Sequence, residues 1–366
     1  MSHLKRILLI TENLGSGGAE RQLCGLAAML TEAGYPCRVI TYIENQFYLP
    51  YLKEKHVDYQ FVPPLANRFL RIPRLVRYIR GYKPDVVISF LGHVNVYLCV
   101  ARLFYRFELI VSERNNHTSL SLSDRLTFNL YRMADYVVPN SCCEADFIKS
   151  HCTWLSGKVV PVTNFVDTGK FVPPATQKNN DKPLKILTLA RYSEQKNVLR
   201  FLEAVRLVKD AGLKVRFEWY GNICSPCNLY NQATEHVRNL GISDYISLHD
   251  RRNDVIPLYQ HADVFCLPSL FEGYPNTIVE AMSCGLPVLC ANTYENPSII
   301  KDGENGFLFN PFDINSIFAA IVKITNTTSE QRRKIGLSNR NKCLHHNSTA
   351  IFINNYIRLV DHEIDF

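Results

Sequence analysis

Short apolar runs alternate with longer amphipathic stretches along the whole of this 366-residue chain. Runs of four to eight residues rich in Ile, Val and Leu are typical of strands buried on both faces of a parallel sheet. We expect strands in the first half at KRILLIT, CRVITY, VDYQFV, DVVISFL, ELIVSE, DYVVPN and KVVPVTN, and in the second half at LKILTLA, VRFEWYG, YISLHD, DVFCLP and LPVLCAN.

The stretches between these runs have helical periodicity. NVLRFLEAVRLVKDAG, for example, spaces Leu199, Leu202, Val205 and Val208 by three or four positions and ends in a glycine. Repeated β-α-β order predicts an α/β fold with parallel, doubly wound sheets. Ligands of such sheets bind at the carboxyl ends of the strands, so motifs at strand ends carry the most information about function.

The polar window VPPATQKNNDKP predicts a break between two domains. We expect a Rossmann-like domain at 1–172, a linker at 173–183 and a second Rossmann-like domain at 184–348. The last apolar stretch, about 349–366, follows a polar break at HHN and predicts a helix that can pack back on the first domain.

Composition indicates a globular protein, with 46% apolar and 20% charged residues. No window contains 18 consecutive apolar residues, so we expect no membrane-spanning helix. The first apolar run is about six residues long and no small-residue cleavage site follows it, so we interpret it as a strand of a cytoplasmic protein and not as a signal peptide. The net charge of +7 suits an anionic partner such as a nucleotide, a lipid phosphate or an acidic membrane face, and it is too small to predict nucleic-acid binding.

The twelve cysteines are scattered. Several, such as Cys24 and Cys266, stand inside apolar runs as small hydrophobic residues. Cys224 and Cys227 form a C-x-x-C pair, but no second pair at zinc-finger spacing accompanies it. We therefore predict no metal site.

A glycine turn follows the first strand in ILLITENLGSGGAERQL. Gly15, Gly17 and Gly18 leave backbone N–H groups open at the start of a helix, which suits an anion. The alternative is a plain tight turn. It is not the dinucleotide fingerprint G-x-G-x-x-G, because Glu20 stands where the third glycine is needed.

The stretch EGYPNTIVE follows the apolar strand ADVFCLPS. One interpretation is structural: Thr277 and Glu280 match a T-x-x-E capping box, which leaves Glu272 unexplained. The functional interpretation is that backbone N–H groups hold a pyrophosphate while the two glutamates accept hydrogen bonds from opposite ends of a sugar nucleotide. Eight helical steps between the glutamates would span about 12 Å.

The segment RIPRLVRYIRGYK predicts an amphipathic helix. Its apolar face is Ile72, Leu75, Val76 and Ile79, and Arg71, Arg74, Arg77 and Arg80 fall on the other face. The arginines form either a solvated face or a contact for anionic lipid headgroups or a lipid-diphosphate acceptor.

EGYPNTIVE resembles the E-x7-E motif of the retaining glycosyltransferases of family 4, which have the GT-B fold, and GSGGAERQL is similar to a helix start of the same family. The resemblance covers essentially the whole chain. It implies an N-terminal acceptor domain, a C-terminal donor domain for a nucleotide sugar, and a final helix that returns to the first domain. Domain closure would bring the Gly17 turn onto the donor.

By this resemblance Glu280 binds the ribose and Glu272 lies beside the transferred sugar. LARYSEQKN resembles the family's cationic loop, so Arg191 and Lys196 neutralise the diphosphate; the alternative is an ordinary solvated pair. The residues implied for donor binding are Gly17, Gly18, Arg191, Lys196, Glu272, Gly273, Tyr274, Pro275, Asn276, Thr277 and Glu280. Those implied for catalysis are Glu272, His93, Arg191 and Lys196.

Three positions depart from the family's usual glycines: Ala190, Asn197 and Phe165. Phe165 leaves the conformation of the turn in TNFVDTGKF undecided. His93 follows a strand and is either structural or a contact of the donor sugar. Arg114, in VSERNN, also ends a strand, and we expect it to bind an acceptor phosphate or to pair with Glu113 or Glu20.

The expected reaction moves an N-acetylhexosamine or hexose from a UDP-linked donor to a lipid-diphosphate-linked glycan, with retention, in polysaccharide or O-antigen synthesis. The enzyme would work at the cytoplasmic face of the inner membrane. No Asp-x-Asp occurs in the chain, which favours a metal-independent reaction without a cofactor. The alternatives are a GT-B sugar-nucleotide epimerase, a Rossmann oxidoreductase and a non-catalytic nucleotide-binding partner.

Overall fold

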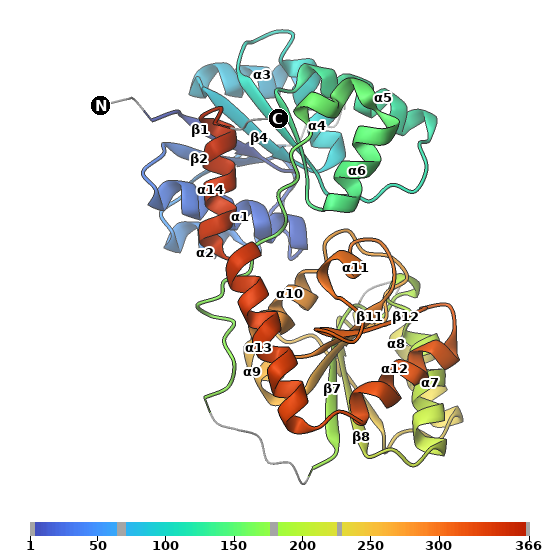
Figure 1. Cartoon of the computed structure of the whole chain (residues 1–366). Helices are drawn as coiled ribbons and strands as arrows, with labels where there is room; N and C mark the ends of the chain where they lie inside the picture. The colour runs from blue at the N-terminus through green and yellow to red at the C-terminus, as the bar shows by residue number, and fades with distance from the viewer. Residues whose placement is uncertain (1–3, 64–70, 176–181, 225–228, 364–366) are drawn as a thin grey trace. The chain divides into compact units, whose positions relative to one another are not determined.

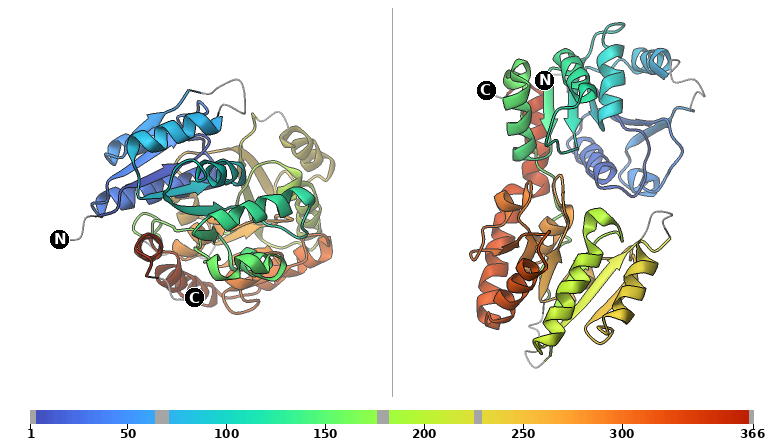
Figure 2. Two further views of the ribbon diagram at one scale, coloured as in Figure 1. Left: turned by 90° about the horizontal axis from the view of Figure 1, so that it is seen from above. Right: turned by 90° about the vertical axis from the view of Figure 1, so that its right-hand side faces the viewer.

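The computed structural model describes residues 4–63, 71–175, 182–224 and 229–363. It divides the chain into two compact units, 1–165 with 349–366 and 166–348. Each unit is built on one six-stranded parallel sheet with helices on both faces, as the pattern of apolar runs predicts (Figure 1). Figure 2 shows the layers of each unit from two further directions.

The first sheet has the strand order β3-β2-β1-β4-β5-β6, which is the Rossmann order. Its strands are β1 (Ile7–Ile10), β2 (Cys37–Thr41), β3 (Asp58–Phe61), β4 (Val86–Phe90), β5 (Glu108–Glu113) and β6 (Tyr136–Pro139). The strand predicted at KVVPVTN is wrong, because Val159 makes only an isolated bridge to Val137. The N–H groups of Val160 and Val162 donate to the carbonyls of Val137 and Pro139, both at 3.0 Å, but no regular strand forms.

Two separate apolar clusters cover the two faces of the first sheet. In β1, Ile7 and Leu9 face one cluster, while Leu8 and Ile10 face the other, as the two-residue period of a strand requires. The helices of this unit are α1 (Gly18–Glu32), α2 (Leu49–Glu54), α3 (Arg71–Tyr82), α4 (Gly92–Ala101), α5 (Leu122–Leu130), α6 (Cys142–His151) and α14 (Thr349–Val360), with short 3-10 helices η2 (Tyr131–Met133) and η3 (Thr153–Lys158).

Helix α14 belongs to the first unit although it lies at the end of the chain. Its buried residues Phe352, Tyr356 and Leu359 join the cluster that α1 also lines. At its end, Lys5 Nζ donates to the carbonyl of Val360 at 2.6 Å. The C-terminal helix therefore completes one face of the first sheet (Figure 1).

Helix α3 buries Leu75, Val76 and Ile79, as predicted, while Ile72 is half-buried. Arg77 is exposed on the opposite side. The outward position predicted for Arg71 is wrong: its guanidinium lies 5.6 Å from the centre of the Tyr42 ring, and Nη1 lies 3.4 Å from the hydroxyl of Tyr97. The first arginine of the helix is thus turned toward the sheet.

The second sheet repeats the same topology with the order β12-β11-β10-β7-β8-β9. Its strands are β7 (Leu184–Leu189), β8 (Val215–Gly221), β9 (Ile246–Asp250), β10 (Val264–Leu267), β11 (Val288–Ala291) and β12 (Gly306–Phe309). Five of them match predicted runs. We missed β12, because GFLF is only four residues long and follows a polar turn.

The helices of the second unit are α7 (Val198–Asp210), α8 (Tyr230–Asn239), α9 (Ile256–His261), α10 (Asn276–Ser283), α11 (Asn296–Ile299), α12 (Ile314–Thr325) and α13 (Ser329–His346), with η4 (Glu194–Lys196) before α7. Figure 1 shows α9, α10 and α13 on one side of the sheet and α7, α8 and α12 on the other. Helix α7 buries Leu202, Val205 and Val208 and is followed by Gly212 at φ +64°, which agrees with the predicted glycine stop.

The structure divides the chain at 165/166, seven residues before the boundary expected at 172/173. The segment after Phe165 is tied to the second unit by its backbone: the N–H of Val166 donates to Asn347 O at 2.8 Å. Arg340 Nη1 and Ser283 Oγ donate to the carbonyl of Phe171 at 2.9 and 2.7 Å. Residues 176–181 of the expected linker lie outside the described residues.

In each sheet the strand order reverses beside the first strand, between β1 and β4 and between β7 and β10. Ligands of open α/β sheets bind at this point, beyond the carboxyl ends of the strands. The loops that emerge there contain most of the motifs singled out from the sequence.

Candidate functional site

Two of the predicted site residues meet beyond the carboxyl ends of β7 and β10. Lys196, the last residue of η4, donates from Nζ to Oε1 of Glu272. The two side chains are only 14% and 12% exposed, so the pair is largely shielded from solvent. The sequence separates these residues by 76 positions, and the crossover of the sheet brings them together.

Backbone hydrogen bonds join the loops that hold this ion pair. The N–H of Leu270 donates to the carbonyl of Gln195 at 2.8 Å, and Gln195 Nε2 donates to the carbonyl of Phe271 at 2.9 Å. Arg191, which comes directly after the β7 strand end, is exposed and donates weakly to Gln195 Oε1 at 3.4 Å. Lys196 is therefore not the ordinary solvated residue of the alternative interpretation, whereas Arg191 keeps an exposed guanidinium beside the pair.

Asn197 stands where the family usually has glycine, and the structure accounts for the exchange. Its φ of 61° and ψ of 31° are left-handed, a conformation that asparagine tolerates better than most residues. Its side chain is buried, donates to the carbonyl of Pro311 at 2.8 Å and accepts from Arg200 Nη1 at 2.7 Å. These bonds hold the turn that carries Lys196.

The helix after Glu272 begins earlier than the capping box at Thr277 predicts. Pro275 is its N-cap, with an extended ψ of 92°, and α10 runs from Asn276 to Ser283. The capping box of Thr277 and Glu280 is wrong, because no side chain caps this helix in the structure. The 12 Å estimate is also wrong: only the positions from Asn276 onward are helical, so eight helical steps do not separate the glutamates.

Glu280 lies inside α10 and is 3% exposed. Its Oε2 accepts a hydrogen bond of 2.7 Å from the hydroxyl of Tyr259, which comes from α9. Tyr259 also contacts the carbonyl of Thr277 at 3.2 Å and so links the carboxylate to the first turn of the helix. Sequence reasoning missed Tyr259, because nothing in IPLYQH indicates a contact with a glutamate 21 positions away.

Tyr274, in the turn before α10, is held by a hydrogen bond from the end of α13. Its ring is 9% exposed, and its hydroxyl accepts from Asn347 Nδ2 at 2.6 Å. The turn between the glutamates is therefore partly buried. Gly273 lies on one side of the anchor and Pro275 on the other, so the backbone N–H groups at the start of α10 are presented on a fixed loop.

In the first unit, the glycine turn after β1 has the predicted strand-turn-helix geometry. Gly17 is the N-cap of α1 and Gly18 is its first residue. A Cβ on Gly17 would collide with the carboxylate of Glu20, which folds back over the helix start and accepts a hydrogen bond from its own backbone. Burial raises the pKa of Glu20, and the charge of Glu12 raises it further. In this structure a carboxylate therefore occupies the position that suits an anion.

His93 lies in the first turn of α4, beyond the carboxyl end of β4. Leu91 before it has a φ of +87°, a backbone conformation that a leucine adopts only when the surrounding structure imposes it. The strained turn places His93 Nε2 3.4 Å from Glu12 Oε1, which follows β1. The structure thus joins the two strands of the first switch point through a histidine and a carboxylate.

Arg114 follows β5, as predicted, but the ion pair expected with Glu113 is wrong. Its guanidinium donates to Asn164 Oδ1 at 2.6 Å, contacts the hydroxyl of Tyr356 at 3.4 Å and lies 3.9 Å from the centre of the Phe90 ring. Glu113 does not pair with the guanidinium; its Oε1 accepts from the backbone N–H of Arg114 at 3.1 Å. Burial lowers the pKa of Arg114. Its acceptor role stays a prediction.

Phe165 is another position at which the family usually has glycine, and its ring packs against Gly25 of α1. A Cβ on Gly25 would overlap its ring, and the ring also packs 4.9 Å from that of Phe352 in α14. Gln22 Nε2 donates to the carbonyl of Phe165, and Gln22 Oε1 accepts from its N–H, both at 2.9 Å. The turn is therefore well held.

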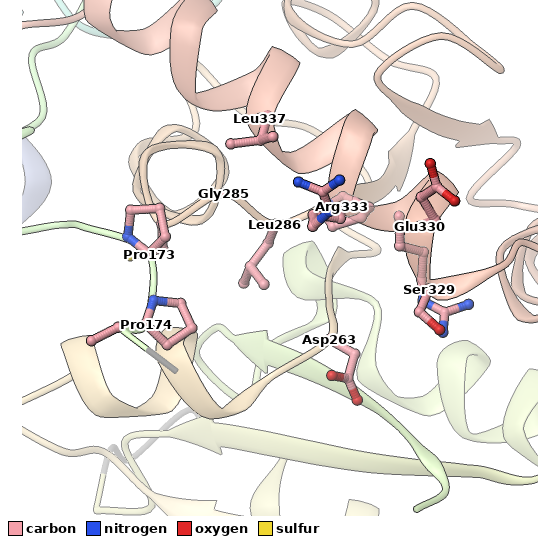
Figure 3. A pocket seen from close by; sticks show the side chains of 13 residues that line it. Pro173, Pro174, Asp263, Gly285, Leu286, Ser329, Glu330, Arg333 and Leu337 are labelled. Carbon is pink, nitrogen blue, oxygen red and sulfur yellow. The ribbon is translucent and has the colours of Figure 1, made fainter. Parts of the chain in front are cut away.

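The second unit also has a cavity of about 480 Å³ at the opposite ends of its strands, where Asp263 precedes β10 and Pro287 precedes β11. Figure 3 shows Ser329, Glu330 and Arg333 of α13 around it, across from Pro173. It is remote from Lys196 and Glu272 along the sheet. We therefore do not assign it to the donor.

Among the described residues, no three His, Cys, Asp or Glu side chains are grouped closely enough to hold a metal ion. None of the helices in the described parts of the chain is long and apolar enough to cross a bilayer. Cys24 and Cys266 are fully buried, as expected. Cys227 of the C-x-x-C pair lies outside the described residues.

Two Rossmann-like domains with their polar loops at the switch points define the GT-B class of proteins. Residues 173–342 match the model described as "Glycosyl transferases group 1", and residues 16–170 match that of "Glycosyltransferase Family 4". The chain belongs to the glycosyltransferases of family 4.

Relatives include the UDP-Gal:alpha-D-GlcNAc-diphosphoundecaprenol alpha-1,3-galactosyltransferase of Escherichia coli, which is 32% identical over 46% of each chain. The GalNAc-alpha-(1->4)-GalNAc-alpha-(1->3)-diNAcBac-PP-undecaprenol alpha-1,4-N-acetyl-D-galactosaminyltransferase of Campylobacter jejuni is 25% identical over 83% of this chain and 84% of its own. Among solved structures, a glycosyltransferase from Rickettsia africae has a TM-score of 0.86 at 18% identity, with 98% of both chains covered. Anabaena Alr3699/HepE in complex with UDP and glucose has a TM-score of 0.83 at 17% identity, covering 98% of this chain and 99% of its own.

Proposed function

We propose that this glycosyltransferase moves an N-acetylhexosamine or hexose from a UDP-linked donor to a lipid-diphosphate-linked glycan. The observation that carries the proposal is the shielded Lys196–Glu272 pair beside the start of α10, at the switch point of the second sheet. A nucleoside diphosphate gains negative charge as it leaves, and fixed cations and amide groups stabilise that charge.

The donor site follows from these positions. Lys196 and the exposed Arg191 neutralise the diphosphate, and the backbone from Gly273 to Thr277 holds sugar and phosphate oxygens. Glu280 accepts hydrogen bonds from the ribose, and Tyr259 keeps its carboxylate in place. Glu272, oriented by Lys196, binds hydroxyls of the transferred sugar. We also assign His93, Gly17 and Gly18 to donor binding, as the sequence resemblance implies.

A lipid-diphosphate acceptor is supported by the relatives, two of which act on undecaprenol-diphosphate glycans according to their names. We expect the enzyme to act at the cytoplasmic face of the inner membrane in polysaccharide or O-antigen synthesis. Arg80 is exposed and donates to the carbonyl of Phe104 at 2.6 Å, beside Leu103 and Phe104, which are 67% and 58% exposed. This mixture of cationic and apolar side chains suits an anionic membrane surface.

We propose further that the reaction retains the anomeric configuration and needs no metal. The products named for both relatives are α-linked. In a front-face attack the β-phosphate of the donor takes the acceptor proton, so the cations that hold this phosphate are the main protein contribution. The carboxylates, in this mechanism, bind sugar hydroxyls and not a metal ion.

The proposal is tested by a thermal-shift screen of the whole chain against UDP-, GDP-, ADP- and dTDP-sugars, with and without EDTA. A ligand at 100 times its Kd stabilises the folded state by about 2.7 kcal/mol. We expect UDP-sugars to raise the Tm in EDTA as much as in Mg²⁺. Product analysis by NMR with the stabilising donor then reports the anomeric configuration. Epimerised donor in the absence of acceptor would instead indicate the epimerase.

A further inference from the structure

Of the polar cluster at the carboxyl edge of the first sheet, the proposed donor site uses only His93. Glu12 follows β1 and Tyr42 follows β2, while Arg71 begins α3. His93 and Tyr97 come from α4, one turn apart. Two loops and two helices thus bring five polar side chains to one place, beside the switch point between β1 and β4.

The contacts within this cluster are loose for an arginine. Arg71 Nη1 lies 3.4 Å from the Tyr97 hydroxyl, and its guanidinium lies 5.6 Å from the centre of the Tyr42 ring. In the described parts of the chain, no carboxylate lies within ion-pair distance of Arg71. A guanidinium presents five N–H donors, so most of the binding capacity of Arg71 is unused.

Two buried polar atoms of the cluster have no hydrogen-bond partner among the described residues: Arg71 Nε and the hydroxyl of Tyr42. Tyr42 is only 5% exposed. A buried polar group left without a partner costs about 1–3 kcal/mol, and native proteins rarely keep one without a reason. Both atoms belong to residues in contact with each other, which indicates one shared ligand.

The charges of the cluster identify the kind of ligand. Burial raises the pKa of Tyr42. Glu12 and Tyr97 raise this pKa further and Arg71 lowers it, so all three lie close enough to Tyr42 to interact with it electrostatically. Tyr42 is therefore a neutral donor near pH 7. Arginine and neutral hydroxyl donors suit a phosphate, whereas the Glu12 carboxylate and His93 suit sugar hydroxyls.

We propose that Arg71, Tyr42 and Tyr97 bind a phosphate of the acceptor's diphosphate, and that Glu12 accepts a hydrogen bond from the sugar attached to it. This inference rests on the proposed function, since it assigns the acceptor's anion to the first unit. The inference gives Arg71 and Arg114 different roles, with the acceptor's phosphate assigned to Arg71. The guanidinium of Arg114 already bonds to Asn164 and Tyr356 and thereby secures helix α14.

The test uses inorganic pyrophosphate as the probe and thermal shift as the readout. The Lys196→Gln variant removes the main donor-site cation, so the remaining protection reports other anion sites. We expect Lys196→Gln to keep measurable protection, and Lys196→Gln with Arg71→Gln to lose it. The matched control is Lys196→Gln with Arg77→Gln, because the Arg77→Gln substitution removes the same charge from the exposed side of the same helix. This double variant should keep the protection. Loss of all protection in Lys196→Gln alone would show that pyrophosphate binds only at the donor site and would overturn the inference.

Kinetics separate the acceptor from the donor. We expect Arg71→Gln to raise the KM for a diphosphate-linked glycan by about 10- to 100-fold and to leave the KM for the nucleotide sugar unchanged. Tyr42→Phe, which keeps the ring, should raise the same KM to a smaller extent. If Arg71→Gln raised the KM for the same glycan without its diphosphate by an equal factor, the role of Arg71 would be merely structural and the inference would be contradicted. If no donor supports transfer but the pyrophosphate pattern holds, the anion site stands and the proposed function fails.

Discussion

The two sheets share one strand order, but the side chains at their carboxyl edges are held differently. In the second unit, Lys196 pairs with Glu272 in a shielded contact and Tyr259 binds Glu280 at 2.7 Å. In the first unit, His93 and Glu12 lie 3.4 Å apart, as do Arg71 and Tyr97. The contacts at the second edge are short and shielded, while Arg71 at the first edge makes only long contacts. This contrast agrees with the proposed donor site in the second unit and the proposed acceptor site in the first.

The largest expected effect comes from breaking the ion pair. Lys196→Met should lower kcat by about 10²- to 10³-fold, as removal of one group that stabilises transition-state charge does. It should also destabilise the fold, since a shielded Glu272 without its partner costs about 3–5 kcal/mol. Turnover under saturating substrate and denaturant unfolding measure the two effects.

The double variant Lys196→Met with Glu272→Gln distinguishes function from stability, because it removes the stranded charge. We expect it to recover most of the stability and none of the activity. Lys323→Met, which breaks the exposed pair with Asp302, is the control and should change neither. Recovery of activity in the double variant would show that the pair only holds the loops together.

A smaller effect is expected at Glu280. Glu280→Gln should raise the KM for the nucleotide sugar by about 10- to 100-fold, because hydrogen bonds to a charged acceptor are lost. Tyr259→Phe removes only the group that positions the carboxylate and should have a weaker effect in the same direction. Isothermal titration with the free nucleotide checks both. The exposed Glu304→Gln variant is the control, and an unchanged nucleotide affinity in Glu280→Gln would refute the ribose assignment.

The smallest effect is a pH dependence in the first unit. The hydrogen bond between His117 Nδ1 and Glu144, at 2.7 Å, raises the pKa of His117 against the opposing effect of burial. Its stabilisation, about 1–2 kcal/mol, is thus complete below the unfolded pKa of about 6.5 and is lost as pH rises through the higher folded pKa. The pKa of Glu144 is also raised, chiefly by its own burial, which acts at more acidic pH.

Unfolding curves of wild type and His117→Gln from pH 6 to 9 measure this dependence. We expect the free energy of unfolding to fall with pH in the wild type and to fall less in the variant. His261→Gln, at an exposed histidine of the second unit, should retain the wild-type slope. Identical slopes in all three proteins would show that the His117 pair contributes nothing to the difference.

Much of the fold was predictable because near-continuous apolar runs have one common explanation, burial in a parallel sheet. The failures have local causes. KVVPVTN is apolar enough for a strand, but it forms only a single bridge to β6, between Val159 and Val137. GFLF is too short to stand out, yet β12 forms because β11 supplies a parallel partner along its full length.

The candidate site was predictable in its residue types and less so in its geometry. The glycines, cations and glutamates singled out from the sequence follow strand ends, and the chain direction of a parallel sheet places those loops at the carboxyl edge of each sheet. The sequence did not predict the bounds of the helices or the partners of the side chains. The capping box of Thr277 and Glu280 satisfied the sequence pattern, but Tyr259 binds the carboxylate instead.

The order of apolar and polar residues was sufficient to establish two doubly wound sheets and the loops that matter, because strand burial and helix periodicity are local properties. The partners of Lys196, Glu280 and Arg71 were decided only when the sheets formed, since each contact joins loops or helices that no local pattern relates. The inward turn of Arg71 is the clearest case. Helical periodicity assigned it to the solvent face, and packing beside Tyr42 and Tyr97 placed it at the edge of the sheet.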